Sequence, residues 1–372
     1  MNKILKIFLF FAIIFNCSAV FAQENNDNIV VSHSYEKAMV LSVEDIIEEI
    51  DKKNNHGGKE IVSFQKLKIK ILSGKYKNDE QEIKNSISNN PLDLNIKKGD
   101  KILIYIEELQ NGAYTTQVQG FYVLPSMIFL ILLFFLVLLI IGGKQGLKAI
   151  LSLAVSIFLI FKLFIPRALN GDNPILLSLI VSAIIAIVTL TLISGFRKKT
   201  ISAILGTIGG VASAALLAII FGNFAHLNGL SDENAITMFS QFSSLDFKGL
   251  LFAGIIIGAL GAVMDVAMSI SSTIAEVKKA NPQIKKTRLI KAGLAVGKDI
   301  MGTMSNTLIF AYVGSSLFLV LLFTQYGESY LNFLNFNFVA EEIVRSIAGS
   351  IGLILAVPLT AIIAGYLESK NK

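Results

Sequence analysis

Seven long apolar segments fill the C-terminal two-thirds of the chain. They lie near residues 123–141, 146–165, 174–194, 201–221, 249–272, 300–323 and 343–366. Each is close to the roughly 20 residues that an α-helix needs to cross a bilayer. The pattern predicts a mainly α fold in which residues 121–372 form a polytopic membrane bundle of about seven transmembrane helices.

The first 120 residues show two other patterns. Residues 1–22 begin with Lys3 and Lys6 and continue through a short apolar run, the order of a secretory signal peptide with cleavage after Ala22. Residues 23–120 are polar, but apolar and polar positions alternate over 65–72 as in a half-buried strand. Strands also flank the turn signal Gly99-Asp100. We predict a small exported β-barrel or OB-like domain over residues 23–120.

Composition agrees with a membrane protein. Hydrophobic residues make up 53% of the 372 residues and charged residues only 16%, outside the range of ordinary soluble domains. Cys17 is the single cysteine, so the chain cannot form an internal disulfide or a cysteine metal cluster. Two alternatives to the cleaved signal peptide stay open, a lipid attached at Cys17 and an uncleaved membrane anchor.

The net charge of +6 reflects topology more than a nucleic-acid partner, because most basic residues border apolar segments. Basic residues gather in alternate connections, at Lys144, Lys148, Arg197, Lys198, Lys199, the 276–299 segment, Lys370 and Lys372. Acidic residues such as Glu341 and Glu342, with Arg345, occupy the other connections. By the positive-inside rule, we expect the N-terminal domain outside and the C-terminus in the cytoplasm. The 276–299 segment is then a basic cytoplasmic loop, either unstructured or an amphipathic helix at the interface.

One polar stripe runs along the fifth apolar segment. At helical spacing it contains Gly254, Gly258, Gly261, Ala262, Asp265, Ser269, Ser272 and Glu276. A carboxylate facing lipid at mid-membrane costs about 3 kcal/mol. We therefore expect Asp265 to face protein or a water-filled cavity.

The sixth segment begins with a matching face. Asp299, Thr303 and Asn306 lie on one side of a helix at a depth similar to that of Asp265. Oxygen-rich side chains around a carboxylate suit a proton, Na⁺ or a divalent cation. The sequence predicts that the two faces meet as a substrate or ion pathway of six residues, Asp265, Ser269, Ser272, Asp299, Thr303 and Asn306. An ordinary hydrogen-bond network between helices is the structural alternative.

Five glycines are expected to serve helix packing. Gly206 and Gly210 lie in the fourth segment, and Gly254, Gly258 and Gly261 lie in the fifth. Small residues at such spacing let helix backbones approach closely, and a hinge is the alternative.

Enzyme signatures are absent from the sequence. Gly143-Lys144 lacks the spacing of a phosphate-binding loop, and neither HExxH nor GxSxG occurs. The three histidines, His33, His56 and His226, are scattered. We expect no catalytic residues, no metal site and no cofactor.

Two central motifs resemble a known family. The stretches GALGAVMDVAMSISS at 258–272 and GKDIMGTMSNTLIFAY at 297–312, with KIKILSGKY at 68–76, are similar to the YibE/F-like multipass membrane proteins of bacteria. The resemblance covers about 65–366 and leaves 23–63 unmatched. It implies a protein of the bacterial cytoplasmic (inner) membrane and no established reaction.

Two functions fit these patterns. The first is a transporter or permease component for an ion or small solute, with Asp265 as a proton or cation site. The second is a non-transporting receptor or scaffold whose exported β-domain senses a ligand or partner. The expected partners are the lipid bilayer and a small solute, proton or cation; a second copy of the chain or another membrane protein stays open, and no nucleic acid is expected.

Overall fold

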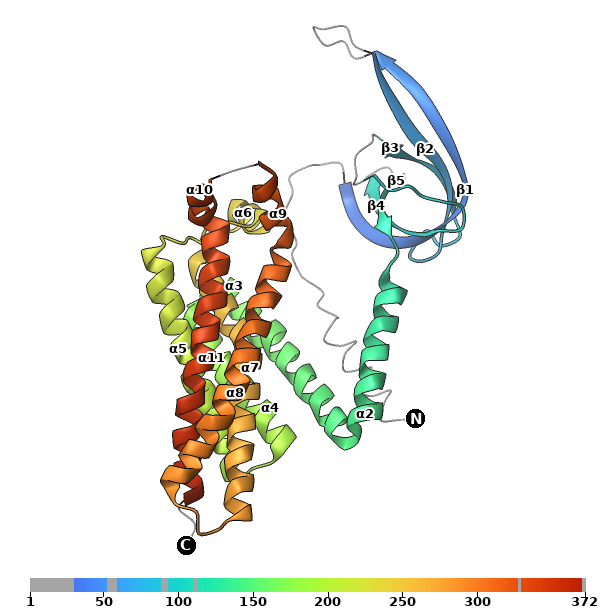
Figure 1. Ribbon diagram of the computed structural model, residues 1–372. Helices are drawn as coiled ribbons and strands as arrows, with labels where there is room; N and C mark the ends of the chain where they lie inside the picture. The colour runs from blue at the N-terminus through green and yellow to red at the C-terminus, as the bar shows by residue number, and fades with distance from the viewer. Residues whose placement is uncertain (1–29, 52–58, 88–92, 110–112, 327–328, 370–372) are drawn as a thin grey trace. The chain divides into compact units, whose positions relative to one another are not determined.

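The computed structural model describes residues 30–51, 59–87, 93–109, 113–326 and 329–369, which divide into two compact units (Figure 1). One unit holds the β-strands and the chain as far as Leu136, and the other holds the helical bundle from Val137 onward. The predicted signal peptide, residues 1–22 with Cys17, lies outside the described residues.

The N-terminal unit is one antiparallel sheet. Its strands are β1 (Val30–Asp51), β2 (Lys59–Ile71), β3 (Glu80–Ile87), β4 (Lys101–Leu109) and β5 (Tyr114–Phe121), in the order β3-β2-β1-β4-β5. The alternation predicted for β2 is confirmed, since Leu67, Ile69 and Ile71 are fully buried on one face. They pack against a matching set of isoleucines from β4, Ile102, Ile104 and Ile106.

The sheet curls until its two edge strands come close (Figure 1). The Tyr114 hydroxyl donates a hydrogen bond to Asp79 over 3.0 Å, and the Thr116 hydroxyl donates to Gln81 over 2.8 Å. These bonds join β5 to the start of β3 through side chains. The domain is therefore a half-barrel, which matches the predicted β-barrel or OB-like shape in part.

The second unit is helical. Its elements are α2 (Leu124–Leu159), the π-helix η1 (Ile160–Phe164), α3 (Ile165–Leu169), α4 (Pro174–Ser194), α5 (Lys198–Phe224), α6 (Glu233–Gln241), α7 (Phe247–Ala280), α8 (Lys286–Ser315), α9 (Leu317–Tyr326), α10 (Tyr330–Asn335) and α11 (Asn337–Ser369). The long helices α5, α7, α8 and α11 run alongside one another (Figure 1). Their shared core contains mostly small and β-branched residues, such as Ala214, Val263 and Ala356.

Within the described residues, five helices are long and apolar enough to cross a membrane, or six when α8 and α9 count as one span bent by 60°. The prediction of about seven spans is thus not confirmed. The first candidate is a 46-residue stretch, Leu124–Leu169, with a break at Gly143, where φ is 51° and ψ is −123°. Gly146 lies directly against the backbone of Leu138. Eight residues of straight helix would separate these two by about 12 Å, so the chain reverses direction at Gly143.

The segment 276–299 is not a loop. Helix α7 continues to Ala280 and α8 begins at Lys286, which leaves residues 281–285 as the connection. Neither the basic loop nor the separate interfacial helix is correct, because lysine, arginine, alanine and leucine favour helix and simply extend the two neighbouring helices. The predicted span 300–323 is also divided, since α8 ends at Ser315.

Candidate functional site

The polar stripe of α7 lies on the outside of the bundle. Asp265 and Ser269 are exposed, as are Gly254 and Gly261, and Ser272 is half-buried. The opposite face of the helix, with Val263, Val266 and Ile270, is fully buried. The expectation that Asp265 faces protein or a cavity is therefore wrong for the single chain.

The matching face of α8 is exposed as well. Asp299, Thr303 and Asn306 point away from the core, because α8 packs through its glycine face. Gly293 lies against Ile274 of α7, and Gly297 lies against Val357 of α11. Small residues permit this close approach and so set the rotation of the helix.

The two polar faces lie at similar depth but do not bond to each other. Helices α7 and α8 are antiparallel, with Gly258 beside the Tyr312 hydroxyl and Gly297 beside Ile270. Asp265 has no hydrogen-bond or ion-pair partner among the described residues. The Thr303 hydroxyl donates to the Ile300 carbonyl of its own helix, over 2.9 Å. The predicted contact between the two faces is absent within this part of the chain.

The predicted packing glycines divide into two groups. Gly206 lies against Thr360, and Gly210 lies against Ala356 and Val263, so both bring α5 close to its neighbours. An added side chain at Gly254 or Gly261 would meet open space instead. Gly258 lies against the Tyr312 hydroxyl of α8, so of the three α7 glycines Gly254 and Gly261 face open space.

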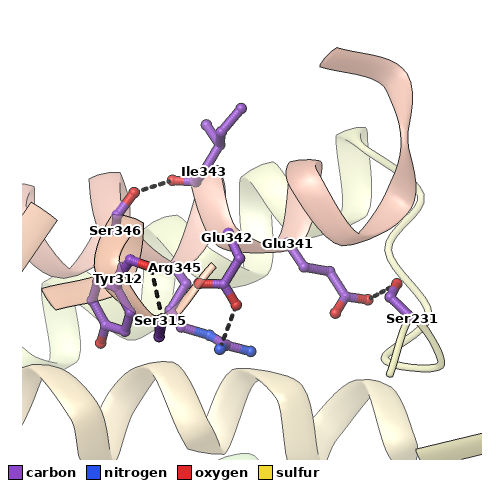
Figure 2. Close-up of polar contacts among 8 residues, drawn as sticks. All are labelled: Ser231, Tyr312, Ser315, Glu341, Glu342, Ile343, Arg345 and Ser346. Carbon is purple, nitrogen blue, oxygen red and sulfur yellow. Dashed lines mark hydrogen bonds and ion pairs between the residues drawn. The ribbon is translucent and has the colours of Figure 1, made fainter. Parts of the chain in front are cut away.

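A second polar group lies at the start of α11 and was not singled out from the sequence (Figure 2). Glu341 is only 6% exposed and accepts hydrogen bonds from the Gly229 amide, over 3.2 Å, and the Ser231 hydroxyl, over 2.8 Å. These bonds hold the loop after α5 against α11. The prediction that these charges lie in a connection between spans is wrong. Glu342 and Arg345 are three residues apart before an apolar run, a spacing that is typical of an ion pair on a helix.

Glu342 and Arg345 form an incomplete ion pair. Arg345 Nη1 donates to Glu342 Oε1 over 2.6 Å, while Glu342 Oε2 and Arg345 Nε are buried with no hydrogen-bond partner. The side chains are 16% and 29% exposed. Figure 2 shows Tyr312 of α8 beside this pair. Since the Tyr312 hydroxyl also lies against Gly258, the pair adjoins the glycine end of the α7 stripe, about 10 Å along the helix from Asp265.

Two hollows lined by described residues of the bundle lie away from Asp265. One of about 160 Å³ is lined by α4, α5 and α7 and contains the buried hydroxyls of Ser182 and Thr207. The other, about 470 Å³, lies between Ser231 and Asn335. Neither is lined by Asp265. Within the described ranges, no three Asp, Glu, His or Cys side chains come together as a metal site.

Each of the two units matches a model of a known protein family. A family model described as YibE/F-like protein matches residues 130–370, and a model described as YibE/F family N-terminal domain matches residues 32–121. The second match extends the resemblance into 32–63, which the sequence motifs had left unmatched. No curated protein and no solved structure matches the chain.

Proposed function

The chain belongs to the YibE/F-like family, and we propose that it is a membrane transporter or permease component for an ion or small solute. The observation that carries this proposal is the exposed polar face of α7 and α8, centred on the unpartnered Asp265. In the proposal, Asp265 is a proton or cation site, and Ser269, Thr303 and Asn306 supply oxygen ligands.

The depth of Asp265 supports this function. Helix α7 has 34 residues, about 51 Å of helix, and Asp265 lies about 27 Å along it from Phe247. A carboxylate exposed to lipid at such a depth costs about 3 kcal/mol. A covering partner removes this cost, so a second copy of the chain or another membrane protein completes the pathway in the proposal.

The pathway covers about 20 Å of α8, from Tyr312 to Asp299, out of the roughly 30 Å of hydrocarbon. At one end, Tyr312 links it to the Glu342–Arg345 pair. From there the polar positions continue through Asp265 and Thr303 to Asp299, which lies about 20 Å along α8 from Lys286 at the basic turn. This series of polar groups supplies stepwise binding positions for a proton or solute.

The proposed topology has seven crossings. Leu124–Leu169 spans about 69 Å as helix, twice the hydrocarbon thickness of about 30 Å, and its reversal at Gly143 makes it two crossings. Lys198, Lys278 and Lys286 lie at the same end of the bundle. The positive-inside rule assigns that end to the cytoplasm of a bacterial cell and the half-barrel to the outside.

A receptor or scaffold is the second candidate, favoured by an aromatic group on the half-barrel. Tyr35 of β1 is 59% exposed, and its ring centroid lies 5.1 Å from that of Tyr105 of β4. The ring of His33, two residues before Tyr35 on β1, has its centroid 5.8 Å from that of Tyr105. Such a surface suits a ligand with an apolar face.

Proton and cation flux into proteoliposomes separates the two functions. The wild-type chain is expected to conduct under an imposed gradient, and Asp265→Asn is expected to abolish the flux. Glu276→Gln is the matched control, since Glu276 is an exposed carboxylate near the end of the same helix. Absent flux in the wild type, together with normal function of Asp265→Asn in cells, would exclude the transporter. A receptor would instead lose function on deletion of residues 23–120.

A further inference from the structure

In the Glu342–Arg345 pair, one hydrogen-bond donor, Arg345 Nε, and one acceptor, Glu342 Oε2, have no hydrogen-bond partner among the described residues. A guanidinium and a carboxylate normally bind through two parallel hydrogen bonds. Here one bond forms, over 2.6 Å, and Arg345 Nε and Glu342 Oε2 stay buried without partners. A buried charged atom that lacks a partner needs an explanation, and a group that binds there is one.

The arrangement fits an incoming oxyanion better than a permanent ion pair. Two oxygens of a carboxylate can accept from Nε and an Nη of Arg345 together, which satisfies the buried donor. The 29% exposure of the Arg345 side chain gives access to it. Glu342 must then release Arg345, and a proton on its free carboxylate removes the repulsion between the two anions.

The ligand's charge follows from the neighbouring residues. Arg345 is the only basic residue of α11, and α8 has none after Lys298. Glu341 is a second carboxylate beside Glu342, and Asp265 and Asp299 lie farther away, about 10 Å along α7 from Gly258 and about 20 Å along α8 from Tyr312. A dianion would meet one cation and several like charges, whereas a monoanion accompanied by one proton is neutral overall.

We propose that Arg345 binds the carboxylate of a small monocarboxylate in place of Glu342, and that Glu342 takes up one proton from solution as the anion binds. This inference names the solute class of the proposed transporter and rests on that function only for the later movement of the solute. No bond of the solute changes. The anion and the proton enter together, and both leave when Glu342 returns to Arg345.

The titratable and polar groups beside Glu342 also affect how ligand binding depends on pH. On its own helix these are Glu341 and Arg345; Tyr312 lies on α8, and Ser316 follows the end of α8 directly. Glu341 is held by Gly229 and Ser231, and its role is tested separately. Glu342→Gln replaces the carboxylate by a neutral group of the same shape and so isolates its proton.

The test is binding of pyruvate to the purified full-length chain in nanodiscs, measured by calorimetry at pH 6 and pH 8. Methyl pyruvate, which lacks the charge, and inorganic phosphate are the comparison ligands. Wild-type affinity is expected to fall as pH rises, by up to about tenfold per pH unit, the limit for uptake of one proton. Glu342→Gln is expected to bind at pH 8 as the wild type does at pH 6.

Substitution of Arg345 tests whether the ligand needs the two parallel hydrogen bonds of its guanidinium. Arg345→Lys keeps the charge but loses the bidentate geometry, and pyruvate affinity is expected to fall about tenfold or more. Arg167→Gln, an exposed arginine of α3, is the matched control and is expected to bind normally. The inference is overturned by equal binding of pyruvate and methyl pyruvate, by wild-type affinity in Arg345→Lys, by unaltered pH dependence in Glu342→Gln, or by phosphate binding without pyruvate binding.

Two results separate this inference from the proposed transport. Pyruvate binding with the expected dependence on Arg345, but with no flux of any solute, supports the site and defeats the transporter. Proton flux that depends on Asp265, without pyruvate binding, supports the transporter and defeats the site.

Discussion

The packing of α5 against α7 and α11 predicts that Gly210→Ala destabilises the bundle. A β-carbon at this position would lie 2.7 Å from the Ala356 β-carbon and 2.8 Å from a Val263 methyl group. Carbon atoms pack best at about 3.5–4.0 Å, so the helices must separate by about 1 Å. Overpacking of this kind costs about 1–3 kcal/mol.

Gly254→Ala is the matched control for this prediction. Gly254 also lies inside a long helix, but nothing lies within 4 Å of an added β-carbon. Both variants gain about 1 kcal/mol or less from the higher helix propensity of alanine. The propensity gain cancels in the comparison, so the two variants are expected to differ by the overpacking cost alone, about 1–3 kcal/mol.

Pulse proteolysis across a titration with sodium dodecyl sulfate measures this difference on the purified full-length chain. Gly210→Ala is expected to unfold at lower detergent fraction than the wild type, and Gly254→Ala at the same fraction or higher. Equal midpoints for the two variants would refute the helix contacts described around Gly210. A stable Gly254→Ala protein that loses proton or cation flux would support a partner molecule on this face of α7, because the added methyl group meets nothing within the chain.

Three further outcomes follow from the structure. Leu67→Ala opens a cavity in the half-barrel and is expected to cost its fold about 2–5 kcal/mol, seen as faster limited proteolysis of that domain in the full chain; an unchanged rate would contradict the core. Burial, and then the hydrogen bond to Asp79, raises the pKa of Tyr114 to about 12. The resulting stabilisation is present below the ordinary pKa of 10.0 and is lost as pH rises through 12, so absorbance titration should show a late tyrosinate from Tyr114 that moves earlier in Asp79→Asn. Ser231→Ala removes a hydrogen bond to the buried Glu341 and is expected to lower stability by about 1.5–3 kcal/mol in a thermal melt, with no change if that contact is absent.

The sequence predicts a helix or a strand well where the spacing of its hydrophobic residues is regular. The alternation around Leu67 identifies a strand, and long apolar runs identify the membrane helices. Helix ends are harder, because a lysine such as Lys286 is unfavourable in lipid but favourable in a helix. The predicted loop at 276–299 was therefore mostly helix.

The rotation of each helix is harder still to predict. Polar side chains on α7 and α8 suggest that Asp265 and Asn306 meet, yet α8 turns its glycines toward the core instead. Close contacts of Gly293 with Ile274 and of Gly297 with Val357 set this rotation. A hydrophobic period read from one sequence does not show which of two small or polar faces packs inward.

The lengths of α7 and α8 have a mechanical consequence. Both helices are about 15–20 Å longer than the hydrocarbon layer and meet in a short connection, residues 281–285. Lys286 also lies over the Tyr366 ring, 4.2 Å from its centroid, which links this connection to the end of α11. A tilt of α7 therefore also displaces the five-residue connection and the start of α8. In the proposed topology, a movement around Asp265 would reach the cytoplasmic surface in this way.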